Sequence, residues 1–185
     1  KIERCPTCYD PDAHAFGFEF GPQELRRCVK CDTVYAAEYA DPSEVYTDGY
    51  LLGGADFGID VGGARFQEYL EHVGHQRAAM VERIRGGDGS LLDVGCGTGE
   101  FAAAAQVRGW TVQGVEPEQS GAEMTRSRGV EVYGGMLEES GLPERSYDVV
   151  SAFHVLEHMP DSPEFLRMLA RWAKPGGHVV VGVHP

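Results

Sequence analysis

The sequence predicts a doubly wound α/β fold with a mostly parallel sheet, preceded by a small ribbon built around a metal. From residue 86 onward, short apolar runs alternate with segments of helical periodicity. A glycine-rich turn directly follows the first of these runs, and two C-x2-C pairs lie near the N-terminus. Apolar strands that alternate with helices are typical of parallel sheets, because each crossover between parallel strands needs a helix.

The most informative stretch is Leu-Leu-Asp-Val-Gly-Cys-Gly-Thr-Gly-Glu-Phe, residues 91–101. Its glycines, Gly95, Gly97 and Gly99, belong to a segment that we name the glycine turn, residues 95–99. Glycine permits a sharp turn and lets a ligand approach the backbone closely. Asp93, at the end of the preceding strand, would repel a pyrophosphate but could bind an ammonium group. The pattern therefore favours a zwitterionic cofactor with an amino-acid end over a dinucleotide.

This segment resembles the first cofactor-binding motif of class I S-adenosylmethionine-dependent methyltransferases, whose core is Rossmann-like. The resemblance implies that the cofactor is S-adenosylmethionine and that its methionine end is held by Asp93, Gly95, Cys96, Gly97 and Gly99. The alternative is a glycine-rich turn that binds nothing.

The second predicted strand, residues 110–115, ends at Glu116, which lies about 20 residues beyond the glycine turn. A carboxylate at this place can accept hydrogen bonds from both ribose hydroxyls, as it does in dinucleotide-binding folds. Pro117 is expected to line the same site and to begin the next helix, since the first helical position needs no N–H donor.

The adenine end departs from the resembled family, in which an Asp often follows the third strand. Here that strand, residues 130–133, is followed by Gly135 and Met136. We therefore expect adenine to contact Met136 and Leu137, or Glu138. Phe153 and, in the connector before the core, Tyr50 complete the predicted cofactor site. Tyr50 has the alternative role of packing the ribbon against the next domain.

A second constellation, Phe-His-Val-Leu-Glu-His-Met-Pro, follows the buried fourth strand, residues 147–153. If the backbone is helical here, His154, Glu157 and His158 share one face. Three interpretations remain open. His154 acts as a general base on the methyl acceptor, or the three side chains hold a divalent metal, as a similar stretch is thought to do in some quinone-pathway O-methyltransferases. In the third, Glu157 and His158 only fix the turn and contact the cofactor.

Four of the five cysteines form the pattern C-x2-C-x19-C-x2-C. This spacing is typical of a structural zinc site made by two tight turns that bring four thiolates into a tetrahedron. The predicted ligands are Cys5, Cys8, Cys28 and Cys31. Two disulfides are the alternative, but nothing in the sequence suggests secretion.

Composition restricts the partners. The formal net charge is −13, and residues 1–40 carry five basic against seven acidic residues, which argues against a sequence-independent grip on nucleic acid. No run of 18 apolar residues and no apolar signal segment is present. We therefore expect a cytoplasmic protein with a small-molecule partner and no membrane association.

The predicted organisation has three parts: a zinc ribbon at 1–40, an aromatic connector with a cofactor-capping helix at 41–85, and an S-adenosylmethionine-binding core at 86–185. The capping helix, 64–85, is expected to bury a broad apolar face that includes Tyr69 and Ile84. Ser162 is expected to cap the helix before the fifth strand, 178–183. The resembled fold has seven strands, so the core is expected to be truncated after the fifth, with a missing C-terminal segment or an oligomeric partner covering that strand.

These features are similar to those of bacterial methyltransferases that act on sugars, glycan precursors or secondary metabolites, among them sugar C-methyltransferases with an N-terminal zinc-binding domain. The function expected from the sequence is methyl transfer from S-adenosylmethionine to a small molecule. A catalytically degenerate binding module or scaffold is the first alternative, and an RNA methyltransferase that uses the ribbon is the second.

Overall fold

A computed structural model describes residues 2, 4–10, 14–20, 23–38 and 63–183 of the chain. The first part contains strands β1 (His14–Phe20), β2 (Gln23–Cys28) and β3 (Val34–Ala36). The second contains α2 (Ala64–Arg85), β4 (Gly89–Val94), α3 (Glu100–Val107), β5 (Trp110–Val115), α4 (Gln119–Ser127), β6 (Glu131–Tyr133), η2 (Leu137–Glu139), β7 (Tyr147–Phe153), η3 (Leu156–His158), α5 (Ser162–Trp172) and β8 (Ala173–Gly182). None of the helices in the described part is both long and apolar enough to span a membrane.

The second part is a five-stranded sheet in the order β6-β5-β4-β7-β8, in which every neighbouring pair is parallel. The chain moves outward from β4 to β6 and then returns to β7 on the other side of β4. Strand order therefore reverses at β4, and ligands of open α/β sheets bind at the carboxyl ends of the strands beside such a reversal. The parallel, doubly wound sheet confirms the predicted fold class. A ligand site is therefore expected at the carboxyl ends of β4 and β7.

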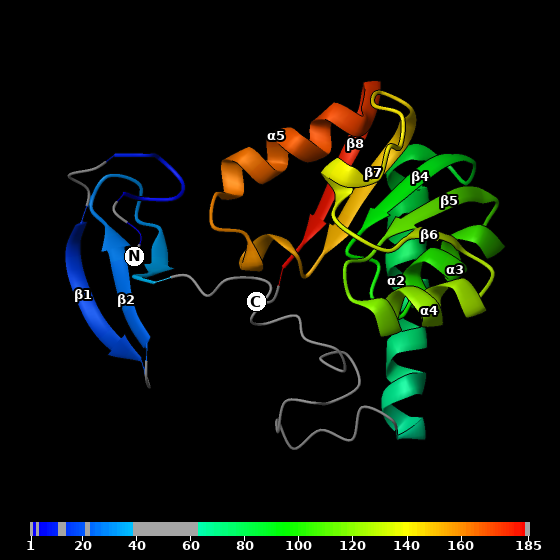
Figure 1. Ribbon diagram of the computed structural model, residues 1–185, viewed down its shortest axis with the longest axis horizontal. Coiled ribbons are helices and arrows are strands. Elements are labelled where there is room, and N and C mark those ends of the chain that lie inside the picture. The colour runs from blue at the N-terminus through cyan, green and yellow to red at the C-terminus, as the bar shows by residue number, and fades with distance from the viewer. Residues whose placement is uncertain (1, 3, 11–13, 21–22, 39–62, 184–185) are drawn as a thin grey trace.

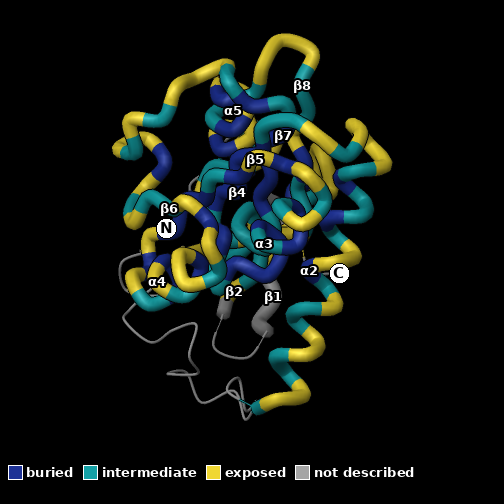
Figure 2. Tube along the Cα trace, turned by 90° about the vertical axis from the view of Figure 1, so that its right-hand side faces the viewer, coloured by how far each residue is buried: buried dark blue, intermediate teal, exposed yellow. Residues whose placement is uncertain are grey.

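Both faces of the sheet are covered, with α2 and α3 packed on one face and α5 on the other (Figure 1). Adjacent residues of β4 serve different faces, because successive side chains of a strand point to opposite sides. Leu91 packs with α2 and α3, whereas Leu92 packs with α5. Figure 2 shows the buried residues concentrated along the central strands and α3. Continuous apolar runs in the strands are explained by this double coverage.

Helix α2 has the predicted bounds, but the face that it buries only partly coincides with the predicted one, which it shares at Val81. Tyr69 and Ile84 are exposed, at 59% and 44%. A Cβ at Gly74 would lie 2.7 Å from the carbonyl carbon of Glu100 in α3. The two helix backbones therefore meet at a glycine, and only small or short side chains fit beside it; the buried residues of the helix are Gly74, Ala78 and Val81.

Two helix starts also differ from prediction. Helix α4 begins at Gln119 rather than at Pro117, because the carboxylate of Glu118 accepts a hydrogen bond from Gly121 N and so acts as the N-cap. Likewise Asp161, and not Ser162, caps α5 by accepting from Glu164 N at 2.9 Å. In both cases a carboxylate next to the expected position satisfies the free amides of the first turn.

The last strand begins earlier than expected. The sequence predicts a strand over 178–183, whereas β8 spans Ala173–Gly182 and includes the Lys-Pro-Gly-Gly segment of residues 174–177. Its pairing with β7 shifts register between Tyr147 and Val149. The glycine- and proline-containing segment is therefore accommodated as an irregularity at the start of an edge strand, where proline is tolerated.

Near the amino end of β7, Asp148 joins three elements. Its Oδ2 accepts from Ser90 N at 3.0 Å and from Lys174 Nζ at 2.7 Å, and its Oδ1 accepts from Arg85 at 3.2 Å. The hydrogen bond from Lys174, helped by Ser90 N, holds the pKa of Asp148 well below its usual range. Asp148 thus ties β4, β8 and the end of α2 to β7.

We expect Asp148→Asn to lower the free energy of unfolding by about 1–3 kcal/mol at pH 7, because charge-assisted hydrogen bonds to Lys174 and Arg85 are lost. An acid whose pKa is lower in the folded than in the unfolded protein stabilises the fold at pH values above the unfolded pKa of about 4. This stabilisation is lost as the pH falls from that value toward the folded pKa. Urea titrations at pH 7 and pH 3 should therefore show a difference between the two proteins that shrinks at pH 3. Glu144→Gln, which removes an exposed pair with Arg171, is the control and should change stability little. An equal loss in both variants would contradict the role of Asp148.

Candidate functional site

The glycine turn leaves β4 with its backbone in the left-handed region. Gly95 and Gly97 have φ of 70° and 54°. A Cβ at Gly95 would lie 2.4 Å from Cγ2 of Val155, which follows β7. A Cβ at Gly97 would meet no atom within 4 Å. The turn is therefore closely packed on the β7 side at Gly95 and open at Gly97, where a ligand can approach the backbone.

Asp93 lies buried beneath this turn, with 3% of its surface exposed. Its Oδ1 accepts from Ser151 Oγ at 2.8 Å, across the β4–β7 pair in which these two residues are register partners. Burial raises the pKa of Asp93 to about 7, while the hydrogen bond from Ser151 and the charge of Arg77 act in the opposite direction. The site therefore holds a carboxyl group that becomes fully ionised only when a positive charge arrives or the pH rises.

Sequence reasoning missed Arg77, which reaches this site from α2. Its guanidinium carbon lies 4.6 Å from the ring centroid of Phe153, and its Nη2 lies 2.5 Å from His154 Nε2. Burial lowers the pKa of Arg77, and the charge of Asp93 opposes that shift. The signal available in the sequence was a basic residue one helical turn from Gly74 and Val81, on the face that α2 buries. The structure thus places a cation beside the predicted acid.

Glu116 lies next to the turn, as predicted, and is almost fully buried. Its Oε2 accepts from Gly97 N at 2.8 Å and its Oε1 from Glu118 N at 2.9 Å. Burial raises the pKa of Glu116, and the two amide hydrogen bonds act against that rise. Each carboxylate oxygen can accept a further hydrogen bond, so the group is still able to receive ribose hydroxyls. The adjacent Pro117 is exposed.

The side chain of Cys96 is buried below the turn. A Cβ at Gly114 of β5 would lie 2.7 Å from its Sγ, and the same sulfur lies 3.9 Å from Thr125 Oγ1. Burial raises the pKa of the Cys96 thiol well above its usual value. Cys96 therefore packs against β5 and α4, and any contact it makes with a cofactor comes from its backbone.

The residues predicted for the adenine end lie beside Glu116. Gly135 N donates to the Glu116 carbonyl at 3.1 Å, which brings the start of η2 to the site. Leu137 is buried and Met136 is 44% exposed. Phe153 packs edge-on against Phe101, with centroids 4.9 Å apart. Tyr50 lies outside the described residues.

The segment after β7 does not form the expected helical face. His154 has φ 59°, a left-handed value that is uncommon for a side-chain-bearing residue, and its N–H donates to the Gly182 carbonyl at 2.7 Å. Its Nδ1 lies 3.3 Å from Glu157 Oε1. Only the 3₁₀ turn η3 follows, from Leu156 to His158. The structure therefore brings His154 to Glu157 and Arg77.

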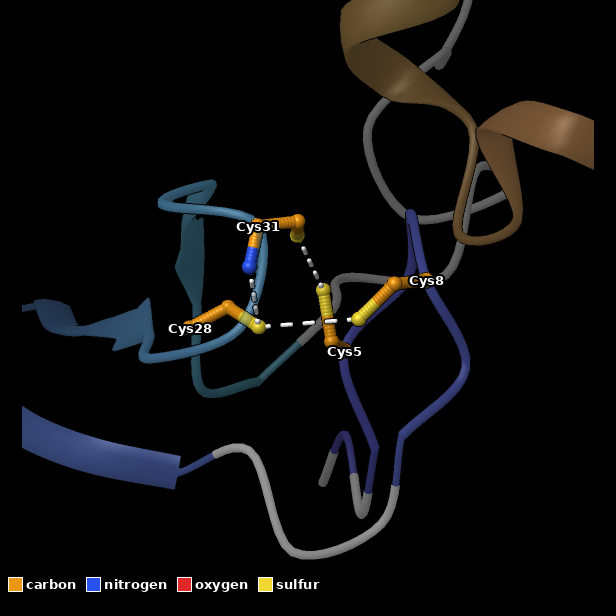
Figure 3. A group of neighbouring side chains, drawn as sticks. All are labelled: Cys5, Cys8, Cys28 and Cys31. Carbon is orange, nitrogen blue, oxygen red and sulfur yellow. Dashed lines mark hydrogen bonds between the residues drawn. The ribbon is translucent and has the colours of Figure 1, made fainter.

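The four predicted zinc ligands do come together. All four sulfurs lie within 4.8 Å of one another, so the four thiols could hold one metal ion. Among the described residues, no other group of three or more His, Cys, Asp or Glu side chains is arranged in this way. Figure 3 shows the pairs Cys5–Cys31 and Cys8–Cys28, whose sulfurs lie 3.5 and 3.6 Å apart. These distances are far longer than a disulfide bond, so the cysteines are free thiols and fit a tetrahedral zinc ion. The divalent-metal interpretation of His154, Glu157 and His158 finds no such grouping in the described part of the chain.

The ribbon touches the second part of the chain through Tyr9, which directly follows Cys8. The hydroxyl of Tyr9 donates to Asp161, the N-cap of α5, and the guanidinium of Arg167 lies 6.0 Å from the ring centroid. Three basic side chains in the described part of the ribbon form ion pairs: Arg26 pairs with Glu24, Arg27 with Asp32 and Lys30 with Asp10.

Comparison with known proteins agrees with this geometry. The ubiquinone biosynthesis O-methyltransferase of Pseudomonas putida is 33% identical over 105 residues, which cover 53% of this chain and 45% of that protein. The protein of the same name from Pseudomonas fluorescens gives the same values. The chain thus spans less than half the length of these relatives.

Solved structures resemble the fold as well. A SAM-dependent methyltransferase from Thermotoga maritima superposes with a TM-score of 0.50 at 25% identity, covering 63% of this chain and 56% of that one. An S-adenosylmethionine-dependent methyltransferase from Mesorhizobium loti gives a TM-score of 0.52 at 24% identity, covering 60% and 54%. Because the family described as "Methyltransferase domain" matches residues 64–184, more than half of the chain, this protein belongs to that family and has the fold of class I S-adenosylmethionine-dependent methyltransferases.

Proposed function

We propose that the chain binds S-adenosylmethionine at the carboxyl ends of β4, β5 and β7 and transfers its methyl group to a small molecule. The observation that carries the proposal is the convergence of Asp93, Glu116 and Arg77 around the glycine turn. A carboxylate and a guanidinium beside an open backbone turn suit a zwitterionic amino acid. A second carboxylate, 19 residues after Gly97, suits a ribose.

Each group has a defined part in this proposal. Asp93 pairs with the ammonium group, and Arg77 pairs with the carboxylate, for which a guanidinium is well suited. Glu116, held by the amides of Gly97 and Glu118, accepts the ribose hydroxyls. The segment around Met136 and Leu137 faces the adenine ring, and the exposed side chain of Met136 gives this segment an apolar surface. The bound cofactor supplies an electrophilic methyl group on sulfur.

His154 is the proposed general base. Its Nδ1 faces Glu157, so Nε2 is the nitrogen that accepts a proton, and in this structure it faces Arg77. With Arg77 turned to the methionine carboxylate, Nε2 would take the proton of the acceptor. The bound cofactor would give its methyl group to the acceptor atom, and the electron pair of the carbon–sulfur bond would remain on sulfur. Positioning supplies much of the rate enhancement, and the base supplies the rest.

The acceptor we favour is a hydroxyl group of a small molecule. The support is the name of the relatives, which are O-methyltransferases, together with the paired charges of the ribbon, which argue against RNA. The narrower prediction of a sugar, glycan precursor or secondary metabolite stays a prediction.

The ribbon at 1–40 is proposed as a structural zinc domain and the region from 86 as the cofactor-binding core, with 41–85 between them.

The cofactor assignment predicts a pH dependence. Burial raises the pKa of Asp93 to about 7, and an ammonium group pairs with the ionised form. We expect the dissociation constant of S-adenosylhomocysteine to fall about eightfold between pH 6 and pH 7.5 as Asp93 ionises. In Asp93→Asn, binding should be at least tenfold weaker and nearly independent of pH over this range. Isothermal titration calorimetry measures both quantities.

Glu116→Gln is the companion variant. It should raise the dissociation constant of S-adenosylhomocysteine while leaving the pH dependence of that constant unchanged. Unaltered affinity in both variants would remove the glycine turn from cofactor binding. Binding to the wild-type chain without any catalysis would favour the degenerate binding module instead.

The proposed base is tested by turnover. Hydroxyl acceptors of the phenol and sugar classes are first screened with the wild-type chain, and the one that it methylates is used for the variants. His154→Ala should lower kcat by about 10²–10⁴-fold while the affinity for S-adenosylhomocysteine changes little. His72→Ala, on the exposed surface of α2, is the control. Full activity of His154→Ala would remove this histidine from catalysis.

Metal content tests the ribbon. The cluster of Cys5, Cys28 and Tyr35 is a small core, so folding of the ribbon should depend on bound zinc. The chain should carry about one zinc ion, measured by atomic emission. Cys28→Ser should lose it, and Cys96→Ser should keep it. Because the described site contains no ribbon residue, chelation should leave S-adenosylhomocysteine affinity nearly unchanged. Stoichiometric zinc in Cys28→Ser would contradict the assignment.

A further inference from the structure

Helix α4 holds the glycine turn from behind. Thr125 Oγ1 donates to the carbonyl of Gly97 at 2.8 Å. Arg128 Nε donates to the carbonyl of Thr98 at 2.7 Å. Thr125 and Arg128 are three residues apart, so they lie on the same side of the end of α4. Two successive carbonyls of the turn are therefore bound by side chains at the end of α4, one from Thr125 and one from the C-cap residue Arg128.

Arg128 also makes two ion pairs with its remaining nitrogens. Its Nη2 lies 2.9 Å from Oε1 of Glu100, the first residue of α3, and its Nη1 lies 2.5 Å from Oε1 of Glu71 in α2. Glu100 in turn accepts from Thr98 Oγ1. Only a guanidinium offers several N–H donors in one rigid plane, so lysine could not make these three contacts together.

The contacts determine the direction of the peptide groups in the turn. In a trans peptide the N–H points opposite to the C=O, so holding the Gly97 carbonyl toward α4 turns the N–H of Thr98 away from it. The Cβ position of Gly99 lies 2.6 Å from Thr125 Oγ1, so the helix also lies directly against the turn at that residue. A glycine-rich segment has much conformational freedom to lose on binding, and a segment already held in one conformation loses less.

We propose that Thr125 and Arg128 are positioning residues for the cofactor. They hold the glycine turn in its binding conformation and, through Glu71, join it to α2, the helix that carries Arg77. Neither side chain touches the face of the turn that is open at Gly97. This inference rests on the proposed function, that the turn binds S-adenosylmethionine.

The sharpest test compares two substitutions at Thr125, which is fully buried. Thr125→Val keeps the shape and removes the hydroxyl, whereas Thr125→Ser keeps the hydroxyl. We expect Thr125→Val to raise the dissociation constant of S-adenosylhomocysteine about tenfold and Thr125→Ser to raise it about twofold or less. Calorimetry is carried out well below the melting temperature of each variant, so that only folded chains are compared.

Arg128 is tested in the same way. Arg128→Met should raise the same dissociation constant by about tenfold or more, and Arg128→Lys should restore little of the loss. Arg126→Met, on the same helix, removes a guanidinium that bonds the Val132 carbonyl and not the turn, so it should bind as the wild type does. Once a methyl acceptor has been identified, Arg128→Met should show a higher KM for S-adenosylmethionine than the wild type and an unchanged kcat at saturation.

The outcomes separate the two proposals. If the wild-type chain binds S-adenosylhomocysteine, and Thr125→Val and Arg128→Met bind it equally well despite lower melting temperatures, the two residues are structural and the inference is overturned while the proposed function stands. If Arg128→Met does not fold, the Val and Ser variants of Thr125 decide the question. If the wild-type chain does not bind S-adenosylhomocysteine, the proposed function fails and the inference fails with it.

Discussion

The arrangement of the site depends on the close approach of the glycine turn to the segment that follows β7. At Gly95 the backbone passes so near Val155 that a methyl group would lie 2.4 Å from its Cγ2. This approach keeps Asp93, at the end of β4, close to Ser151 and to the segment that carries His154. A side chain at position 95 would push the two strand ends apart, and the groups proposed for the cofactor and for the acceptor would separate with them.

Burial determines how the acids of this acidic chain behave. Asp93 and Glu116 lie beneath the site, where loss of water raises the pKa of each carboxyl group. Asp148, at the opposite ends of the strands, faces Lys174 and Arg85, and its pKa is held low. One sheet therefore has an acid with a lowered pKa at its amino edge and two acids with raised pKa values at its carboxyl edge. The difference follows from the neighbours and not from the residue type.

Several parts of the site were predictable from the sequence because they depend on local patterns. The spacing of Gly95 and Gly97 after an apolar run predicts a turn at a strand end, and the distance to Glu116 predicts where the next strand ends. The cysteine spacing predicted the grouping of four thiols, which the structure confirms. The face of His154, Glu157 and His158 that a helical backbone would produce does not form, because the left-handed conformation of His154 ends the regular backbone there.

The sequence by itself determined the order of strands and helices, the place of the glycine turn and the grouping of the cysteines, since each follows from residue types at short separations. Only the tertiary structure decided which distant side chains meet at the turn. Arg77 and Arg128 come from helices on either side of the turn in the sequence, and periodicity cannot say what a guanidinium reaches after two helices pack. That packing depends on Gly74 fitting against α3, a contact between backbones that leaves no sign in the pattern of apolar residues.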